Sequence, residues 1–228
     1  MLRVSHFQRR LAVLVRFCMS CDQEDEKTLS KDWHLKFFEV MGNIVAVTAA
    51  DKCVRAGILP HCRKMLVHSS DPKFLNESCQ LLSNVVADEI HNAKIFALDV
   101  VPRVVELLKV IMFQWYSKML RIHLTLHLQD DDVVHSAMFL IMNFSADSRF
   151  IPRMLECNCL QSIVELLGRG ICRCACMVAI YNILEYEQEQ VGPKMTANSA
   201  ATRELFDAIK ELENDEGLIK ELENDVGF

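Results

Sequence analysis

Cysteine and histidine are the side chains in this sequence with the greatest capacity for chemistry, because both bind metals and act as catalytic groups. The 228-residue chain holds ten cysteines and eight histidines. Cys18 and Cys21 form a single C-x-x-C pair, and Cys172 and Cys176 are four residues apart in an apolar stretch that we expect to be helical. A zinc site needs paired ligands on tight turns, whereas a free cysteine in a helix behaves as a small buried hydrophobe. We therefore expect reduced, intracellular thiols and no metal site.

Motifs for catalysis are lacking in the sequence. It contains no glycine-rich phosphate loop, no H-E-x-x-H and no G-x-S-x-G. His123 and His127 are four residues apart, but they lie in an irregular insertion and have no repeating partner. We therefore expect a protein that is not an enzyme, with no catalytic residues and no cofactor.

The composition predicts an all-α protein without a nucleic-acid or membrane partner. Hydrophobic residues make up 51% of the chain, and its 7 glycines and 5 prolines are too few for an all-β fold. The formal net charge of −6 favours basic or neutral partners. No uncharged stretch reaches the roughly 18 residues that span a bilayer. The segment before Asp22 carries four arginines and no acid, so a mitochondrial transit peptide is an alternative for that segment.

An internal repeat organises the chain. An asparagine recurs inside an apolar, helix-patterned run at Asn43, Asn84, Asn143 and Asn182, so that successive positions differ by 41, 59 and 39 in number. A period of roughly 40 residues is typical of armadillo and HEAT arrays. Each unit is predicted to hold a short helix, a second helix after a turn and a long third helix, and three helices favour armadillo over HEAT.

The helix boundaries of one unit can be predicted from its prolines. The first helix is expected around Asp51–Ala56, the second opens near Pro60, and the third runs from about Pro72 to Ala87. Such units bury their apolar faces only by stacking, which predicts a right-handed superhelical solenoid with a concave groove lined by the third helices.

The asparagines are candidate binding residues. Their amides can donate and accept at once, which suits the backbone of an extended peptide in that groove. Solvent exposure or a local hydrogen bond is the alternative for an asparagine inside a helix.

Several segments together resemble the later armadillo repeats of the importin α family of nuclear-import adaptors. The resemblance covers about residues 35–190 and depends on the order of the segments. It implies the minor binding site of that family, where asparagine holds a signal peptide, tryptophan stacks on lysine stems and acids receive the charges. The segments are Gly42–Val45, Ala56–Pro60, Leu82–Asn84, Tyr181–Leu184 and Glu187–Glu189.

The family's binding residues carry over in part. Glu77 matches a family acid, and Glu39 stands where the family has an arginine. Gln80 and Phe139 stand where the family has tryptophans, so only Phe139 keeps an aromatic face. Loss of cation–π partners predicts weak or altered peptide binding. The predicted peptide-binding residues are Glu39, Asn43, Glu77, Gln80, Asn84, Phe139, Asn143 and Asn182.

The resemblance also suggests how the chain is divided. Residues 1–34 are predicted to be a partial N-terminal armadillo repeat, residues 35–190 the repeats proper, and residues 191–228 acidic capping helices in which Ile209–Asp215 recurs at Ile219–Asp225. The acidic end resembles the family's last repeat, which binds the export receptor. The basic segment through which the family binds importin β has no counterpart, so the chain is expected not to bind importin β.

An irregular insertion at residues 110–129 accounts for the long interval between Asn84 and Asn143. It carries Phe113 and Trp115 and no acid, and its removal would make this interval equal to the one between Asn143 and Asn182. A retained intron in the gene model and a genuine loop insertion are the two alternatives. In either case the segment should protrude or extend a helix.

The sequence thus predicts an adaptor that binds the basic nuclear localisation signal of a cargo protein and works in the cytoplasm and nucleus. A general armadillo scaffold for another extended peptide or partner protein is the alternative, as is a degenerate paralogue without transport activity.

Overall fold

The computed structural model describes Val13 and residues 31–44, 50–109 and 131–191. Within these residues the regular structure is helical, and no strand occurs. The expectations for the insertion at 110–129, the acidic end at 192–228, the C-x-x-C pair and the two spaced histidines lie outside the described residues. The predicted boundary before residue 35 falls inside a helix, since that helix spans Lys31–Ile44.

The helices repeat in the order short, medium and long. After a first long helix, this order occurs three times along the chain, and the helical residues 101–109 supply the medium helix of the second group. The elements are α2 (Lys31–Ile44), α3 (Ala50–Ala56), α4 (Ile58–His68), α5 (Pro72–Val86), η2 (Glu89–His91), α6 (Asn92–Phe96), α8 (Asp131–Ser145), α9 (Ile151–Glu156), α10 (Cys159–Gly168) and α11 (Arg173–Val191).

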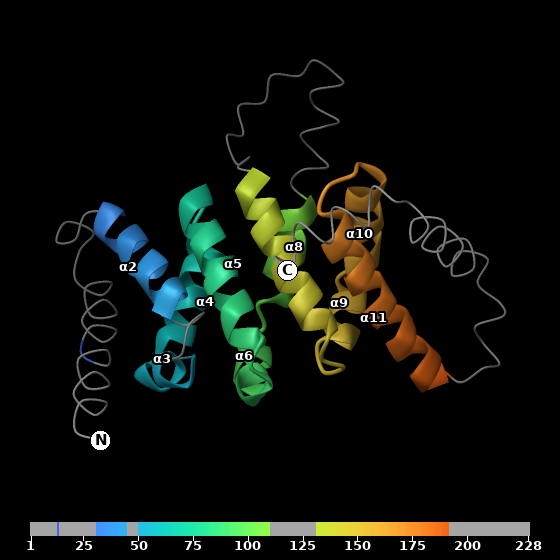
Figure 1. The fold of residues 1–228 in the computed structure, drawn as a ribbon, viewed down its shortest axis with the longest axis horizontal. Helices are drawn as coiled ribbons and strands as arrows, with labels where there is room; N and C mark the ends of the chain where they lie inside the picture. The colour runs from blue at the N-terminus through green and yellow to red at the C-terminus, as the bar shows by residue number, and fades with distance from the viewer. Residues whose placement is uncertain (1–12, 14–30, 45–49, 110–130, 192–228) are drawn as a thin grey trace, which may run out of the picture.

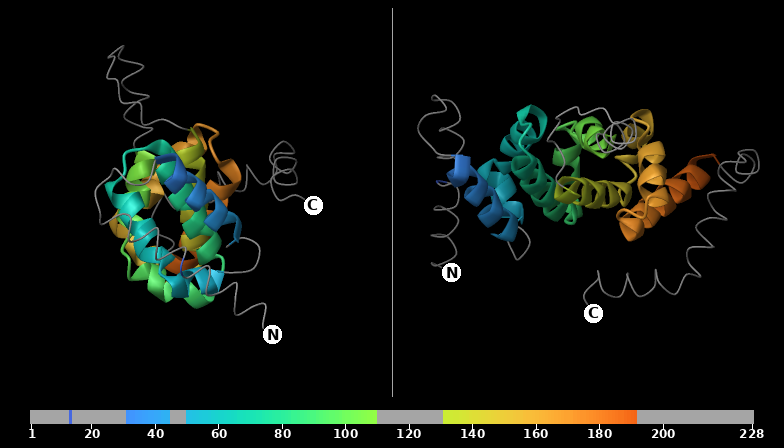
Figure 2. Two further views of the ribbon diagram at one scale, coloured as in Figure 1. Left: turned by 90° about the vertical axis from the view of Figure 1, so that its left-hand side faces the viewer. Right: turned by 90° about the horizontal axis from the view of Figure 1, so that it is seen from above.

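The long helices form a row from one end of the molecule to the other (Figure 1). Helix α5 packs between α2 and α8, and α8 packs between α5 and α11. The row is elongated, so helices at its two ends lie far apart, as two further views show (Figure 2). Each long helix therefore contacts mainly its neighbours in the row.

A left-handed backbone residue separates the short from the medium helix in all three groups. Gly57, Asp99 and Asn158 have φ values of 98°, 49° and 57°. Glycine takes this conformation without steric cost, and asparagine and aspartate are the other residues that adopt it most readily. The same turn is thus made by three different residues, which explains why only the glycine is obvious in the sequence.

The prolines open helices largely as predicted. Pro72 is the first residue of α5, and the carboxylate of Asp71 caps the helix by accepting from the Lys73 N–H at 3.0 Å. The second helix, predicted to open near Pro60, begins two residues earlier at Ile58, directly after the left-handed Gly57. Pro60 is tolerated there because N–H groups in a first helical turn have no partner within the helix.

One hydrophobic core runs through all the described groups and includes Phe38, Phe144 and Phe150, which are fully buried. Five cysteines are buried free thiols in it: Cys53, Cys62, Cys79, Cys159 and Cys176.

The expectation that Cys172 and Cys176 share a helix is wrong. Cys172 adopts a left-handed conformation with φ 50°, and α11 begins only at the next residue. Its carbonyl accepts from the Cys176 N–H at 2.9 Å, so the two cysteines are joined across the first turn of α11. Cys176 alone of this pair is fully buried.

Candidate functional site

The four asparagines that recur in the sequence lie along the row of long helices, one on each. The Nδ2 group of Asn84 donates to the carbonyl of Gly42 at 3.4 Å. That of Asn143 donates to the carbonyl and the hydroxyl of Ser83, at 3.1 Å and 2.7 Å. In both cases the acceptor is the residue immediately before the asparagine of the preceding helix. Two successive helix pairs therefore share one register.

The third pair of helices reaches the same register through a relay. The Nδ2 group of Asn182 donates to the hydroxyl of Ser145 at 2.9 Å, and that hydroxyl donates to the carbonyl of Met142 at 2.6 Å. Met142 precedes Asn143, as Ser83 precedes Asn84. One serine hydroxyl thus bridges the extra distance between α8 and α11.

These bonds give the asparagines a structural role. The sequence had predicted only that they bind a ligand. Asn84 and Asn182 each donate to one acceptor on the preceding helix, and Asn143 donates to two. Each such bond contributes about 1 kcal/mol to stability. The amide oxygen, with its two lone pairs, remains for a ligand at all three residues, and a second N–H remains at Asn84 and Asn182. Asn43, at the start of the row, is exposed on α2.

A second row of side chains, four residues before the asparagines, is exposed to solvent on every long helix. It consists of Glu39, Gln80, Phe139 and Val178. Phe139 is 43% exposed and Val178 is 42% exposed. Sequence reasoning named the first three and missed Val178, although the same offset from Asn182 would have found it.

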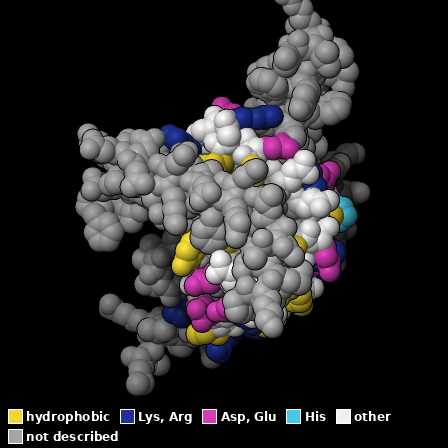
Figure 3. Space-filling view, turned by 90° about the vertical axis from the view of Figure 1, so that its right-hand side faces the viewer, with side chains coloured by type: hydrophobic (Ala, Val, Ile, Leu, Met, Phe, Trp, Pro, Cys, Tyr) yellow, Lys and Arg dark blue, Asp and Glu magenta, His cyan; other side chains and the backbone are white. Residues whose placement is uncertain are grey.

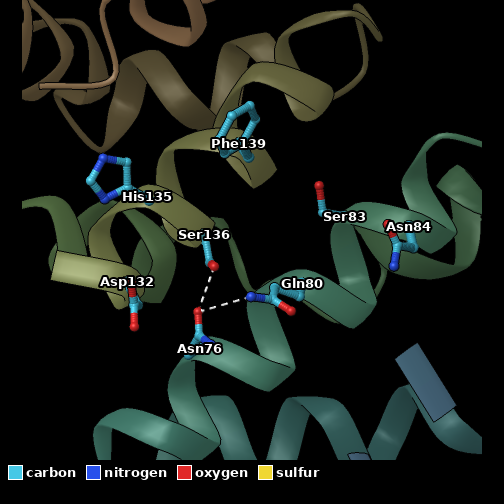
Figure 4. A pocket seen from close by; sticks show the side chains of 8 residues that line it. All are labelled: Asn76, Gln80, Ser83, Asn84, Asp132, His135, Ser136 and Phe139. Atoms are coloured by element: carbon cyan, nitrogen blue, oxygen red, sulfur yellow. Dashed lines mark hydrogen bonds between the residues drawn. The ribbon is translucent and has the colours of Figure 1, made fainter. Parts of the chain in front are cut away.

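A cavity of about 610 Å³ opens between α5 and α8 (Figure 4). In this cavity, Oδ1 of Asn76 on α5 accepts two hydrogen bonds. One comes from Nε2 of Gln80 on the same helix, and the other from the hydroxyl of Ser136 on α8. The Phe139 ring lies on the α8 side. The lining residues are Asn76, Gln80, Ser83, Asn84, Asp132, His135, Ser136 and Phe139.

The structure brings some predicted residues together and separates others. Gln80, Asn84 and Phe139 share the cavity between α5 and α8. Asn143 lines a second cavity of about 340 Å³ together with Asp147 and Arg149. The missed residues Asn76, Ser83 and Ser136 are small polar side chains whose importance depends on a contact between two helices that are distant in the sequence.

Acidic side chains gather at the junction of α2 and α5. Glu77 is half-buried on α5, and its pKa is raised first by burial and then by the negative charge of Glu39 on α2. Burial is the larger cause of this rise, and repulsion from the Glu39 charge adds to it. A cation placed between them would relieve this repulsion, so the junction suits a lysine or arginine side chain.

The surface at the α11 end carries both charges. Among its described side chains, acidic and basic groups lie beside hydrophobic and uncharged ones (Figure 3). No helix among the described residues is long and apolar enough to cross a bilayer.

The buried thiols are poor candidates for chemistry. Burial raises the pKa values of Cys79, Cys159 and Cys176 to about 12, and the thiolate is the form that attacks substrates or binds metals. In the described segments, histidine, cysteine and acidic residues form no group of three or more that could hold a metal ion. The open row of exposed side chains is therefore the best candidate for a functional site.

Comparison with known proteins relates the chain to solved structures only. No protein-family model matches it, and no curated protein is similar to it. Two engineered proteins solved by the Northeast Structural Genomics Consortium superpose on it with TM-scores of 0.55 and 0.57, at 19% and 17% sequence identity. They cover 75% and 84% of this chain, which spans only 62% and 44% of theirs. At this level of identity the likeness concerns the helical fold alone.

Proposed function

We propose that this protein is an armadillo-type, right-handed superhelical solenoid that binds an extended basic peptide along its row of long helices, as an importin-α-like adaptor binds a nuclear localisation signal. The observation that carries this proposal is the row of exposed side chains above the asparagine ties, open to a cavity between α5 and α8. Solenoid stacking displays equivalent positions at a regular interval, which matches the regular interval of residues in an extended chain.

Three features of the row support a basic ligand. Glu39 and Glu77 place two carboxylates at the α2–α5 junction. Asp132 adds a carboxylate to the cavity between α5 and α8. The exposed ring of Phe139 can receive a lysine stem and its ammonium, a contact worth about 0.5–1 kcal/mol at an exposed site. The amide oxygens of the asparagines, and the second N–H of Asn84 and Asn182, can hold the peptide backbone.

Peptide binding to the full chain tests the proposal directly. Fluorescence anisotropy with a labelled lysine-rich peptide should show saturable binding that weakens as salt is added, because the attraction is partly between charges. Replacing Gln80→Trp should tighten binding about two- to fivefold, since a ring would again receive a lysine stem beside Asn84.

Gln161→Trp is the matched control for that variant. Gln161 is also exposed but lies on α10, outside the cavity between α5 and α8. If both tryptophan variants tighten binding equally, the gain in affinity comes from non-specific contacts with an added aromatic ring, and the groove is assigned wrongly. If no basic peptide binds at any salt concentration, the adaptor function is wrong and a degenerate protein without transport activity is the better description.

A general armadillo scaffold is the second candidate, and the side chains of the row give it a specific basis. Gln80 and Val178 hold two of the four exposed positions, and neither side chain stacks on lysine or pairs with its charge. A scaffold of this kind would bind uncharged extended peptides as well as basic ones. Equal affinity for a lysine-rich peptide and its lysine-to-serine counterpart would favour it.

A further inference from the structure

His135 lines the cavity between α5 and α8, and histidine is the side chain that ordinarily changes its charge near neutral pH. It lies on the α8 side of the cavity together with Asp132 and Phe139 (Figure 4). These three residues follow one another at intervals of three and four, so they share one face of the helix. His135 thus lies beside the carboxylate and the ring that the proposed function assigns to a basic side chain.

A hydrogen bond to the backbone fixes which ring nitrogen of His135 carries the proton. Nδ1 lies 2.8 Å from the carbonyl oxygen of Asp131, one helical turn earlier. A carbonyl oxygen can only accept, so Nδ1 is the donor, and in the neutral ring Nε2 has a lone pair. No hydrogen bond among the described residues uses Nε2. The neutral ring therefore has one unused acceptor, on an exposed side chain that lines the cavity.

Other hydrogen bonds in the cavity also leave acceptors for a ligand. The hydroxyl of Ser136 gives its proton to Oδ1 of Asn76, and Nε2 of Gln80 donates to the same atom. These bonds leave the lone pairs of the Ser136 oxygen and Oε1 of Gln80 as acceptors. Because Asp132 adds a carboxylate, the cavity suits a side chain that carries several N–H donors.

We infer that His135 is a further peptide-binding residue, whose Nε2 accepts from the basic side chain seated in the α5–α8 cavity and whose protonation weakens binding. This inference rests on the proposed peptide-binding function and adds to it a residue and a dependence on pH. Protonation converts Nε2 from an acceptor into a donor and gives the ring a positive charge. The basic side chain then loses one hydrogen bond and is repelled by the charge.

Carboxylates are the other groups near this seat whose charge depends on pH. Asp131 and Asp132 lie on α8, and the α5 side of the cavity is lined by asparagine, glutamine and serine. Glu77 lies on α5 at its junction with α2. Helix α11 also packs on α8, but none of its described residues lines the cavity. Protonation of a carboxylate would weaken basic binding too, so a variant that removes only the histidine must separate the two effects.

Peptide binding to the full chain at two pH values tests the inference. The probe is a lysine-rich peptide with capped ends, without histidine or acidic residues, and labelled with a rhodamine. Neither its charge nor its dye responds to pH between 8.0 and 5.5. Its affinity for the wild type should fall about five- to tenfold from pH 8.0 to pH 5.5 at constant salt.

Two variants of His135 separate its effect from that of the carboxylates. His135→Gln has an acceptor that does not titrate, so its affinities at the two pH values should differ by less than about twofold. His135→Ala has no acceptor, so it should bind about two- to fivefold more weakly than the wild type at pH 8.0 and respond as little to pH. His68→Gln is the matched control, because His68 is an exposed histidine on α4 that does not line the cavity. It should keep the full pH response.

A second measurement tests the geometry without a peptide. Long-range ¹H–¹⁵N NMR spectra at pH 8.0 should show the proton of the His135 ring on Nδ1, with the signals assigned by their absence in His135→Gln. A proton on Nε2 would overturn the inference, because that nitrogen could then not accept. Circular dichroism at both pH values checks that each protein stays folded.

The outcomes distinguish the two proposals. If the peptide binds and the wild type and His135→Gln respond equally to pH, the role of His135 is refuted and the proposed function stands. The same holds if His68→Gln loses the pH response as completely as His135→Gln does. If the peptide does not bind at pH 8.0, the proposed function is refuted, and this inference falls with it.

Discussion

The two faces of α8 carry the same kinds of residue, but one face builds the core and the other is exposed to solvent. On one face Phe144 is fully buried and stacks on Phe150, with ring centroids 4.6 Å apart. On the other, Phe139 is 43% exposed beside an open cavity. Five residues along a helix turn a side chain by about 140°, so one phenylalanine builds the core and the next faces solvent.

This contrast shows that residue type alone does not separate structure from function on these helices. The asparagines make the same point, since Asn143 lies on the exposed side of α8 and still ties it to Ser83 of α5. Exposure identifies the candidate binding positions better than residue type does. The residues four before each asparagine are exposed on all four long helices, whatever their type.

Among the substitutions that test this comparison, loss of the core residue Phe144 should have the largest effect on stability. Phe144→Ala should lower the free energy of unfolding by about 3–5 kcal/mol, because it removes buried surface and leaves a cavity beside Phe150. Phe139→Ala should change it by less than about 0.5 kcal/mol. Urea unfolding followed by circular dichroism measures both.

A conservative variant keeps this test informative if Phe144→Ala does not fold. Phe144→Leu retains most of the apolar volume and should cost about 1–2 kcal/mol. Equal destabilisation by Phe139→Ala and Phe144→Ala would mean that the two faces of α8 are assigned wrongly.

Much of the fold could be predicted from local signals in the sequence. The predicted first helix around Asp51–Ala56 corresponds to α3 at Ala50–Ala56, and the predicted third helix from about Pro72 to Ala87 corresponds to α5 at Pro72–Val86. These boundaries depend on glycine and proline, whose backbone preferences act within a few residues. The left-handed turns at Asp99 and Asn158 could not be located in this way, because those residue types are also common in ordinary turns.

The candidate site could be predicted only in part, since its residues meet across long stretches of chain. The sequence shows the four asparagines at nearly regular intervals, but it does not show that Ser83 and Ser145 are their partners. Val178 was not named, because its exposure depends on how α11 packs on α8. Pairwise packing of this kind leaves no mark in a single sequence.

Loss of Asn143, the asparagine of α8, should have the next largest effect on stability. Asn143→Ala should destabilise the protein by about 1–2 kcal/mol, because it removes two bonds to Ser83, one of them at 2.7 Å. Asn43→Ala is the matched control at the exposed start of the row, and it should cost less than about 0.5 kcal/mol. Urea unfolding midpoints at constant pH compare the two variants.

The result decides how the asparagines act. A cost near zero for Asn143→Ala, with lost peptide binding, would return this residue to a purely ligand-binding role. A measurable cost with unchanged peptide binding would leave it a purely structural one.

An ion pair just beyond the end of α8 sharpens the contrast further, because its carboxylate also accepts a hydrogen bond from the preceding group. Asp147 accepts from Nε of Arg149 at 2.9 Å and from Nδ2 of Asn92, on α6, at 2.8 Å. The bonds from Arg149, assisted by Asn92 and opposed by burial, lower the pKa of Asp147 to about 2. Arg149 is about half exposed, so solvent screens part of the attraction.

This lowered pKa predicts a small, acid-sensitive contribution to stability. The carboxyl titrates near pH 3.9 in the unfolded chain and near 2 in the folded one, so its contribution is complete above about pH 5 and disappears as the pH falls toward 2. After screening we expect about 1 kcal/mol. Urea unfolding of the wild type and of Asp147→Asn should therefore differ most at pH 6 and converge toward pH 2–3, because the amide does not titrate. Arg149→Gln should reduce stability in the same pH range, since it removes the same pair from the other side. A difference between wild type and Asp147→Asn that stays constant from pH 6 to pH 3 would show that the Asp147 carboxylate is not held ionised by Arg149, and that the end of α8 is fixed by its uncharged bonds alone.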